Sequence, residues 1–232
     1  MARGPDLTAA LEGFAHTLVA GSDVSDMLHD LTARLPDLLG IAGAGVSLRQ
    51  DGGLRFVTAD HELFAQLERL QESEGEGPCV EAFRTGEPVL VPRLTSEAAR
   101  WPRYVEQATA SGVLAVAAIP MRNSDQVGVL DLYDDKVHEW SGEEVATAAV
   151  FADVAAAYLL HASKLEQERR TVEQLQHALS SRIIIEQAKG ILAAEYQISV
   201  DQAFQRLRRH ANDHNATLHS VAGAVVELGL RP

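Results

Sequence analysis

The chain has 232 residues, a length that fits one or two domains, and 46% of them are hydrophobic, as in a globular protein with a real core. It holds no run of 18 apolar residues, and its first residues lack the apolar core of a signal peptide. We therefore expect a cytoplasmic protein that does not enter a membrane. The single cysteine, Cys79, excludes an internal disulfide framework and a cysteine-based zinc site, and we predict no metal site.

The net charge of -13 is distributed unevenly along the chain. Residues 1–168 carry 12 Lys and Arg against 27 Asp and Glu, whereas residues 169–232 carry 8 against 6 and hold four of the nine histidines. An acidic body repels nucleic acid, so only the tail can approach a phosphate backbone. A solvated acidic surface with an ordinary tail explains the same counts, and charge alone favours that interpretation.

The residues before 142 alternate between helical and strand patterns. The expected helices are 7–19, 27–38, 61–70, 79–84 and 98–111. The expected strands are 44–49, 54–58, 88–91, 113–119 and 126–132. They are separated by Gly21–Ser22, Asp51–Gly52, the loop 72–78 and the turn 123–125. In the helix 61–70 the residues expected to point inward are Leu63, Phe64, Leu67 and Leu70. This order predicts an α+β fold with an antiparallel sheet of about five strands and helices covering one face.

Residues 143–189 contain neither glycine nor proline, which predicts one long helix or two in tandem. Ser141 and Glu144 have the spacing of a capping box at its start. From residue 151, positions in alternating steps of three and four predict a coiled-coil helix over 143–179 that joins two chains. The seam positions are Phe151, Val154, Tyr158, His161, Leu165, Glu168, Val172, Leu175 and Leu179. The two polar members weaken the seam.

Residues 172–232 contain three helical segments, enough for a small bundle with one core. The first segment continues the long helix. Ser199 and Gln202 form a second capping box at the start of the second segment, Thr217 caps the third, and Gly229 ends it.

Basic residues are grouped on the first two of these segments. Arg182 and Lys189 share one stripe of the first helix. The second helix carries Arg206, Arg208 and Arg209 away from its apolar side. Gly190 inside the first helix costs about 1 kcal/mol relative to alanine, so close helix packing or the close approach of another backbone should offset it. A solvated basic face explains these residues equally well from composition alone.

The run 75–91, with the flanking segments 118–121 and 128–132, resembles a GAF domain of the actinobacterial type. The resemblance covers about residues 7–160, and we assign 1–150 to this domain. It implies a sensory module whose sheet and helices can enclose a small ligand. The ligand stays open, because the residue constellation of cyclic-nucleotide GAF domains does not stand out, and a haem or bilin would need a suitably placed His or Cys.

The segments 175–192 and 199–211, with Asn215 and 218–222, resemble the ANTAR domain through all three helices. The strongest mark is the triplet 188–190, Ala-Lys-Gly, after Ser-Arg-x-x-Ile-Glu-Gln. The resemblance implies a dimer that binds RNA stem-loops, typically a pair, and prevents an intrinsic terminator from forming. It also implies control by a sensory domain ahead of it, and no cofactor is needed for RNA binding.

An RNA partner fits the basic residues, because stem-loops are read by shape, phosphate contacts and splayed loop bases. The candidate RNA-binding residues are Arg182, Gln187, Ala188, Lys189, Gly190, Arg206, Arg208, Arg209, His214 and Asn215. The arginines and the lysine would contact phosphates, and the glycine would let an RNA backbone come close. His214 and His219 are weaker candidates. Tyr196 is the candidate stacking aromatic, because Phe204 falls on the apolar face.

Cys79 follows a Gly-Pro pair and is expected near a helix N-terminus, where the helix dipole lowers the pKa of a thiol. It is a candidate redox-sensing thiol or intermolecular disulfide, although a small buried residue is the interpretation we favour. Two other functions stay open. A GAF thiol reductase acting on methionine sulfoxide would need a resolving cysteine, which the chain lacks. A DNA-binding regulator would use the tail as a helix-turn-helix. We expect a homodimeric, non-enzymatic RNA-binding antiterminator, with duplex DNA the less favoured partner.

Overall fold

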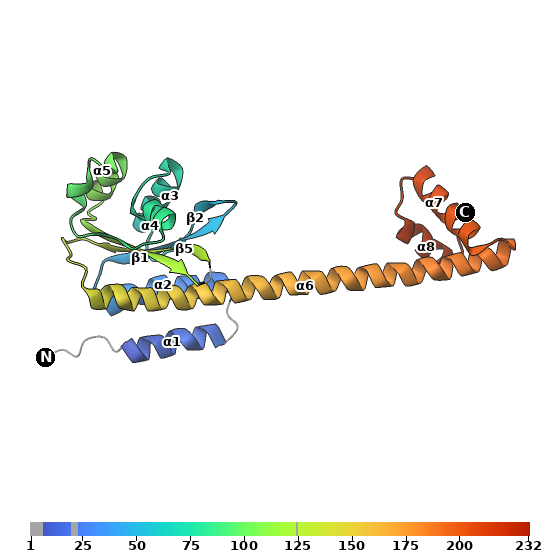
Figure 1. Cartoon of the computed structure of the whole chain (residues 1–232), viewed down its shortest axis with the longest axis horizontal. Coiled ribbons are helices and arrows are strands. Elements are labelled where there is room, and N and C mark those ends of the chain that lie inside the picture. Colours follow the sequence, from blue (N-terminus) through green and yellow to red (C-terminus); the bar gives the residue numbers. More distant parts are fainter. Residues whose placement is uncertain (1–6, 20–22, 124) are drawn as a thin grey trace. The chain divides into compact units, whose positions relative to one another are not determined.

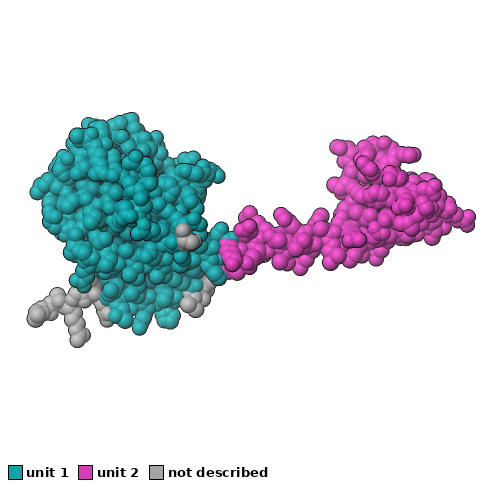
Figure 2. Space-filling view, viewed as in Figure 1, with its two compact units in different colours: residues 1–163 teal, residues 164–232 magenta. Residues whose placement is uncertain are grey.

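A computed structural model describes residues 7–19, 23–123 and 125–232. The predicted break at Gly21–Ser22 and the centre of the turn 123–125 lie outside the described residues. The chain divides into two compact units, Met1–Ser163 (unit 1) and Lys164–Pro232 (unit 2), coloured separately in Figure 2. Each unit is described by itself below.

Unit 1 is built on an antiparallel sheet of five strands in the order β2-β1-β5-β4-β3. The strands are β1 (Gly43–Gln50), β2 (Gly53–Ala59), β3 (Val89–Val91), β4 (Ala115–Arg122) and β5 (Gln126–Asp134). The helices before residue 142 are α1 (Leu7–Val19), α2 (Val24–Leu39), α3 (Glu62–Glu74), α4 (Pro78–Thr85) and α5 (Pro102–Ala110), with a short 3₁₀ turn, η1 (Leu94–Glu97). The predicted α+β fold with a five-stranded antiparallel sheet is confirmed.

The hairpin between β1 and β2 is made by its turn residues. Asp51 and Gly52 both have positive φ, 49° and 81°, which is the backbone of the two-residue turn that matches the twist of paired strands. Gln50 pairs with Gly53 directly across this turn. Aspartate and glycine tolerate that backbone better than other residues, so the Asp-Gly pair fixes the register of the hairpin.

Helices cover both faces of this sheet, so the prediction that they cover one face is wrong. Figure 1 shows α3, α4 and α5 over one face, with α2 and the start of the long helix against the other. The cause lies in β4, whose side chains are buried on both faces. Ala115, Ala117 and Ile119 belong to the cluster with α2, whereas Val116 and Ala118 belong to the cluster with α3, α4 and α5. A strand that is apolar at every position needs a layer on each side.

Two expected helices differ in their bounds and phase. α3 continues to Glu74 and therefore takes in the start of the predicted loop. Leu63 is exposed on it, whereas Glu68 and Gln71 are buried together with Phe64. The buried stripe of α3 is thus partly polar, which an apolar pattern cannot predict. α5 begins at Pro102, because proline fits the first helical turn, where its missing N–H has no partner to lose.

The helix α6 (Gly142–Tyr196) is a single helix of 55 residues that contributes to both units. Its capping box is confirmed: the backbone N–H of Ser141 donates to Glu144 Oε2 at 2.7 Å, and the N–H of Glu144 donates to Ser141 Oγ at 3.2 Å. One window of α6 is long and apolar enough to cross a membrane by length and composition, which is weak evidence. The core packing of Phe151, Ala152 and Ala155 accounts for part of that apolarity.

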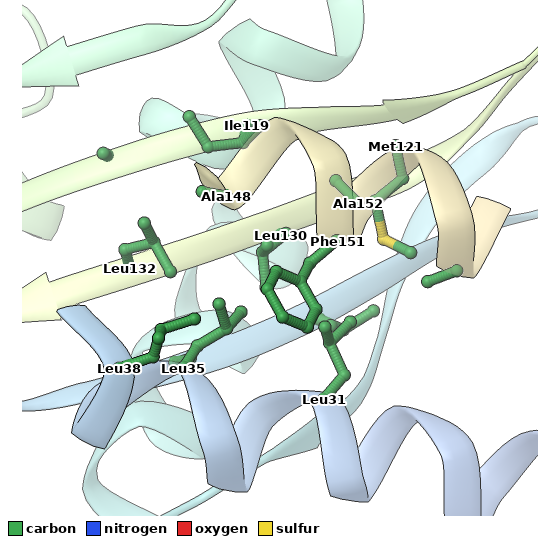
Figure 3. Close-up of a cluster of buried hydrophobic side chains, with 14 of the residues drawn as sticks. Leu31, Leu35, Leu38, Ile119, Met121, Leu130, Leu132, Ala148, Phe151 and Ala152 are labelled. Atoms are coloured by element: carbon green, nitrogen blue, oxygen red, sulfur yellow. The ribbon is translucent and has the colours of Figure 1, made fainter. Parts of the chain in front are cut away.

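Phe151 of α6 is completely buried in unit 1. Its ring centroid lies 5.4 Å from that of Phe14 in α1. Figure 3 shows the ring beside Leu130 of β5 and above Leu31 of α2. The prediction that Phe151 lies in a seam between two chains is therefore wrong, because the core of its own unit already encloses this side chain.

Unit 2 is the three-helix arrangement of the end of α6, α7 (Val200–Asp213) and α8 (Leu218–Glu227). Its core is formed by Ala188, Leu192, Ala203, Leu207, Ala211, Val221, Ala222 and Val225. The second capping box is also present: Ser199 N–H donates to Gln202 Oε1 at 2.9 Å, and Gln202 N–H donates to Ser199 Oγ at 3.2 Å. Thr217 caps α8 by accepting from the N–H of Ser220. These caps fix the residues at which α7 and α8 begin, and so determine which side chains each helix exposes.

Candidate functional site

The three arginines of α7 are exposed to solvent. The guanidinium of Arg206 lies over the ring of Tyr196, 4.1 Å from its centroid, and its Nε donates to the backbone oxygen of Pro232 at 2.9 Å. A shallow hollow of about 380 Å³ lies beside Arg206 and Arg209 and is also lined by Ile198, Asp201, Gln202 and Gln205. Among the residues that the structure describes, neither Arg208 nor Arg209 forms an ion pair, so both charges are available to an anion.

Lys189 is placed differently from these arginines. Only 15% of its side chain is exposed, and its Nζ lies 2.8 and 2.9 Å from the two carboxylate oxygens of Glu186. The same Nζ lies 5.6 Å from the ring centroid of Phe204, within the range of a cation–π contact. Phe204 is half-buried rather than fully buried, so its ring is part core and part platform for the lysine. Lys189 would have to leave Glu186 to contact a phosphate through its full charge.

The other candidate residues near Lys189 differ in their exposure to solvent. Arg182 and Gln187 are exposed. Ala188 is completely buried in the core of unit 2, so the expectation that it contacts RNA fails for its side chain. Gly190 is exposed, and a Cβ built on it would meet no atom within 4 Å. Packing against the other described residues therefore does not explain why a glycine stands at position 190. Of the two explanations considered for it, the close approach of another backbone remains.

The end of α7 carries the two other candidates. His214 is exposed, its Nδ1 lies 2.9 Å from the backbone oxygen of His210, and the two rings are stacked with centroids 4.1 Å apart. Asn215 is exposed and has a φ of 49°, a backbone that asparagine tolerates better than most residues. Its position thus has a local conformational reason that is independent of any ligand.

The residues of the expected seam on α6 become more exposed toward the C-terminal part of the helix. Val154 and Tyr158 are half-buried against the core of unit 1. The later apolar members are exposed at fractions of 52%, 52%, 65% and 62% for Leu165, Val172, Leu175 and Leu179. The two polar members of the seam, His161 and Glu168, are exposed as well. An apolar stripe of this length on one helix is typical of a surface that a partner covers, and we call Leu165, Val172, Leu175 and Leu179 the α6 stripe.

Cys79 is buried in unit 1, at the second residue of α4. Burial raises the pKa of its thiol well above the usual value, and the negative charges of Asp131 and Glu68 raise it further. Burial and the two acidic groups therefore affect the pKa of the thiol more than the helix dipole does, and the thiol stays protonated at neutral pH. A protonated, enclosed thiol is a poor nucleophile, which argues against the redox interpretation of this cysteine in the described conformation.

Sequence reasoning missed the surroundings of Cys79. They include two acidic groups inside an apolar core: Glu68 from α3 and Asp131 from β5 reach the same place, and both are buried. Burial raises the pKa of both carboxyl groups. The sequence pattern marks Cys79 as a candidate thiol but does not connect it with Glu68 or Asp131. Their convergence depends on the sheet register, which no local pattern contains.

Unit 1 is an α+β module whose apolar core encloses a small polar cluster, and unit 2 is a separate helical unit with exposed arginines. A family model described as GAF domain matches residues 23–159, and one described as ANTAR domain matches residues 173–226. The chain belongs to the GAF domain family and ends in an ANTAR domain. It is therefore an RNA-binding transcription regulator with a sensor domain.

Solved structures support the fold of unit 1. The GAF domain of a phosphoenolpyruvate-protein phosphotransferase from Coxiella burnetii is 17% identical over 69% of this chain and 96% of that chain, with a TM-score of 0.55. The free methionine-R-sulfoxide reductase from Neisseria meningitidis, solved with its substrate, is 16% identical over 68% of this chain and 91% of that chain, also with a TM-score of 0.55. No curated protein gives a significant match. At these identities the likeness concerns the fold alone.

Proposed function

We propose that the chain is a cytoplasmic transcription antiterminator that binds paired RNA stem-loops through its ANTAR domain and is controlled by its GAF domain. The observation that carries the proposal is the exposed charge of Arg208 and Arg209 on α7, which forms no ion pair with any residue that the structure describes and lies inside the ANTAR match. Unit 1 is strongly acidic, so the RNA would have to bind at this tail.

The geometry of unit 2 suits a folded RNA. The Arg206 guanidinium lies over the Tyr196 ring, and a guanidinium supported in this way can stack on an unpaired loop base. Arg208 and Arg209 can contact phosphates on either side of the loop. Gly190 has open space above its backbone, where a sugar-phosphate strand can approach more closely than any side chain would allow. Binding of this kind reads shape and loop bases, and it needs no enclosed pocket.

A dimer would give this small surface useful affinity. The α6 stripe is exposed in the single chain, and burying it against a second copy would remove apolar area from water. Two ANTAR domains joined in this way bind two hairpins of one transcript with a raised effective concentration, which increases affinity without new contacts. Holding both hairpins would keep the RNA from refolding into a terminator.

Control by the GAF domain would use α6 itself. Phe151 is buried in the core of unit 1, and Ala188, on the same helix, is buried in the core of unit 2. A ligand-induced change in the packing around Phe151 would alter the helix that carries the α6 stripe. The polar members His161 and Glu168 make more than one seam register accessible, and this is where we place the switch.

The proposal is tested with hairpin RNAs that have randomised loops. The chain is used to enrich the hairpins that it binds from this pool. The binding of each enriched hairpin is then measured in competition with duplex DNA of the same length over a salt series. We expect enrichment of a defined loop sequence and a marked preference for RNA. Equal affinity for RNA and DNA would contradict antitermination and would favour a helix-turn-helix DNA regulator.

A further inference from the structure

Three polar side chains from three different elements meet inside unit 1. Glu68 comes from α3, Cys79 from α4 and Asp131 from β5, and one carboxylate oxygen of each acid and the thiol sulfur all lie within 4.8 Å of one another. Each of these residues is 1% exposed or less. The cluster lies on the face of the sheet that packs against α3, α4 and α5, among residues of that apolar core.

Asp131 makes this cluster unusual. Among the described residues, no donor from outside the cluster reaches either of its carboxylate oxygens, although the residue is fully enclosed. The hydroxyl of Tyr104 is also buried, and the charges of Asp131 and Glu68 raise the pKa of this phenol beyond the effect of its burial. Buried polar groups are nearly always paired, so an enclosed carboxylate whose polar neighbours are only another carboxyl group and a thiol points to a group that completes the site.

The neighbouring residues hold Glu68 in a fixed orientation. Ser47 Oγ donates to Glu68 Oε2 at 2.8 Å, and the Tyr133 hydroxyl donates to Oε1 at 2.9 Å. On the other side, the backbone N–H of Cys79 donates to Gln71 Oε1 at 2.9 Å and so fixes the start of α4. Carboxylate ligands of metal ions are usually oriented by such outer hydrogen bonds.

We propose that Glu68, Cys79 and Asp131 together bind one divalent transition-metal ion, Zn²⁺ or Fe²⁺. Three atoms spaced in this way leave a point within about 2.8 Å of each, and small side-chain shifts would reach the ~2.0–2.3 Å typical of Zn–O and Zn–S bonds. A thiolate beside carboxylates suits a borderline ion: the sulfur disfavours Mg²⁺ and Ca²⁺, and the oxygens disfavour Cu⁺. Three protein ligands also leave a fourth position open for water or a small molecule.

The chemistry of binding balances without redox change. The Cys79 thiol loses its proton as the sulfur bonds to the metal, and any proton on Glu68 or Asp131 is likewise released to solvent. The ion gives Asp131 a positively charged partner, and no ion pair of Asp131 is found among the described residues. The sequence prediction of no metal site rested on counting cysteines. One cysteine is enough when two acids from distant elements complete the set.

Co²⁺ is the probe for the test, because a thiolate bonded to cobalt gives a charge-transfer absorption in the near ultraviolet. The full-length chain is treated with a chelator, incubated with Co²⁺ and desalted. We expect one equivalent of retained cobalt with this absorption, which Zn²⁺ then removes. Cys79 is the only cysteine in the chain, so the band reports this site alone. Asp131→Asn and Glu68→Gln should each lower cobalt retention at least ten-fold.

The control is Glu72→Gln, which removes a carboxylate one turn further along α3 and outside the cluster, and it should bind cobalt as the parent chain does. Three results would overturn the proposal: no retained cobalt, retained cobalt without the thiolate band, or equal retention by Asp131→Asn. The spectrum of the unmodified chain decides the matter even if a variant fails to fold.

Discussion

The guanidinium of Arg206 lies 4.1 Å from the centroid of the Tyr196 ring, and this contact joins the middle of α7 to the last residue of α6. At an exposed site a cation–π contact of this kind is worth about 0.5–1 kcal/mol. We predict that Tyr196→Ala weakens binding of a selected hairpin by about two- to five-fold, as measured by fluorescence anisotropy, since the guanidinium loses its support.

Tyr196→Phe is the matched variant, because it keeps the ring under the guanidinium and removes only the hydroxyl. It should bind RNA nearly as the parent chain does. If the phenylalanine variant loses as much affinity as the alanine variant, the hydroxyl contacts RNA directly, and the positioning role assigned to the ring is wrong.

The salt dependence of RNA binding should separate Arg208 and Arg209 from Lys189. Each phosphate contact contributes about 0.7–0.9 to the slope of log affinity against log salt. The double variant Arg208→Gln and Arg209→Gln should therefore flatten the slope by about 1.4–1.8. Lys189→Met removes a charge that is already paired with Glu186, so it should change the slope less.

Arg170→Gln is the control for this series, since Arg170 is an exposed arginine of α6 that lies outside the ANTAR match and pairs with Glu166. Its slope should equal that of the parent chain. A larger loss of slope in Lys189→Met than in the double arginine variant would show that the lysine leaves Glu186 on binding and carries the main phosphate contact.

The capping box at the start of α6 should make unit 1 sensitive to acid. Burial alone would raise the pKa of Glu144, but the hydrogen bonds from Ser141 and His138 outweigh it and lower the pKa below 4.5. A lowered folded-state pKa gives stability that is fully present above the unfolded pKa and is lost as pH falls through the folded value. Thermal unfolding of unit 1 should accordingly shift down below about pH 4.5.

Ser141→Ala should cost about 1 kcal/mol at neutral pH, or about 2–4 °C in the melting temperature, because one helix-end amide loses its acceptor. The other groups that face Glu144 here are His138 and, through that ring, Asp134. A variant as stable as the parent, with the same acid profile, would mean that the cap contributes nothing measurable.

The switch that we place at His161 and Glu168 is tested by removing its polarity. Leucine at both positions should complete the apolar stripe and stabilise the dimer, as measured by sedimentation equilibrium. RNA binding should then become insensitive to the state of the GAF domain. Unchanged dimer stability together with unchanged regulation would place the switch elsewhere along α6.

The sequence predicted those elements whose cause is local. Asp51–Gly52 predicted the β1–β2 hairpin, because the backbone of the turn limits which residues fit. The two capping boxes, at Ser141 and Ser199, located the starts of α6 and α7, because each depends on residues only three apart.

Three features could not be predicted, because their causes are not local. A heptad pattern is the same whether its partner is another chain or the protein's own sheet, so it could not tell that Phe151 packs in unit 1. The meeting of Glu68, Cys79 and Asp131 depends on the sheet bringing distant segments together. A family motif marks Ala188 without saying that its role is in the core.

The most direct measurement of the central proposal compares one hairpin with two. The parent chain and the double variant Leu175→Asp and Leu179→Asp are titrated with RNAs that carry either a single selected hairpin or two in tandem. A dimer should bind the tandem RNA about 10²–10⁴-fold more tightly than the single one, and the charged variant should lose this gain while keeping its affinity for one hairpin.

The control variant Gln174→Asp with Ala178→Asp places the same two charges on α6 outside the stripe, and it should keep the full gain. The account is contradicted if the chain proves monomeric in sedimentation and still binds the tandem hairpins at full strength, or if the charged stripe variant retains the whole difference between one hairpin and two.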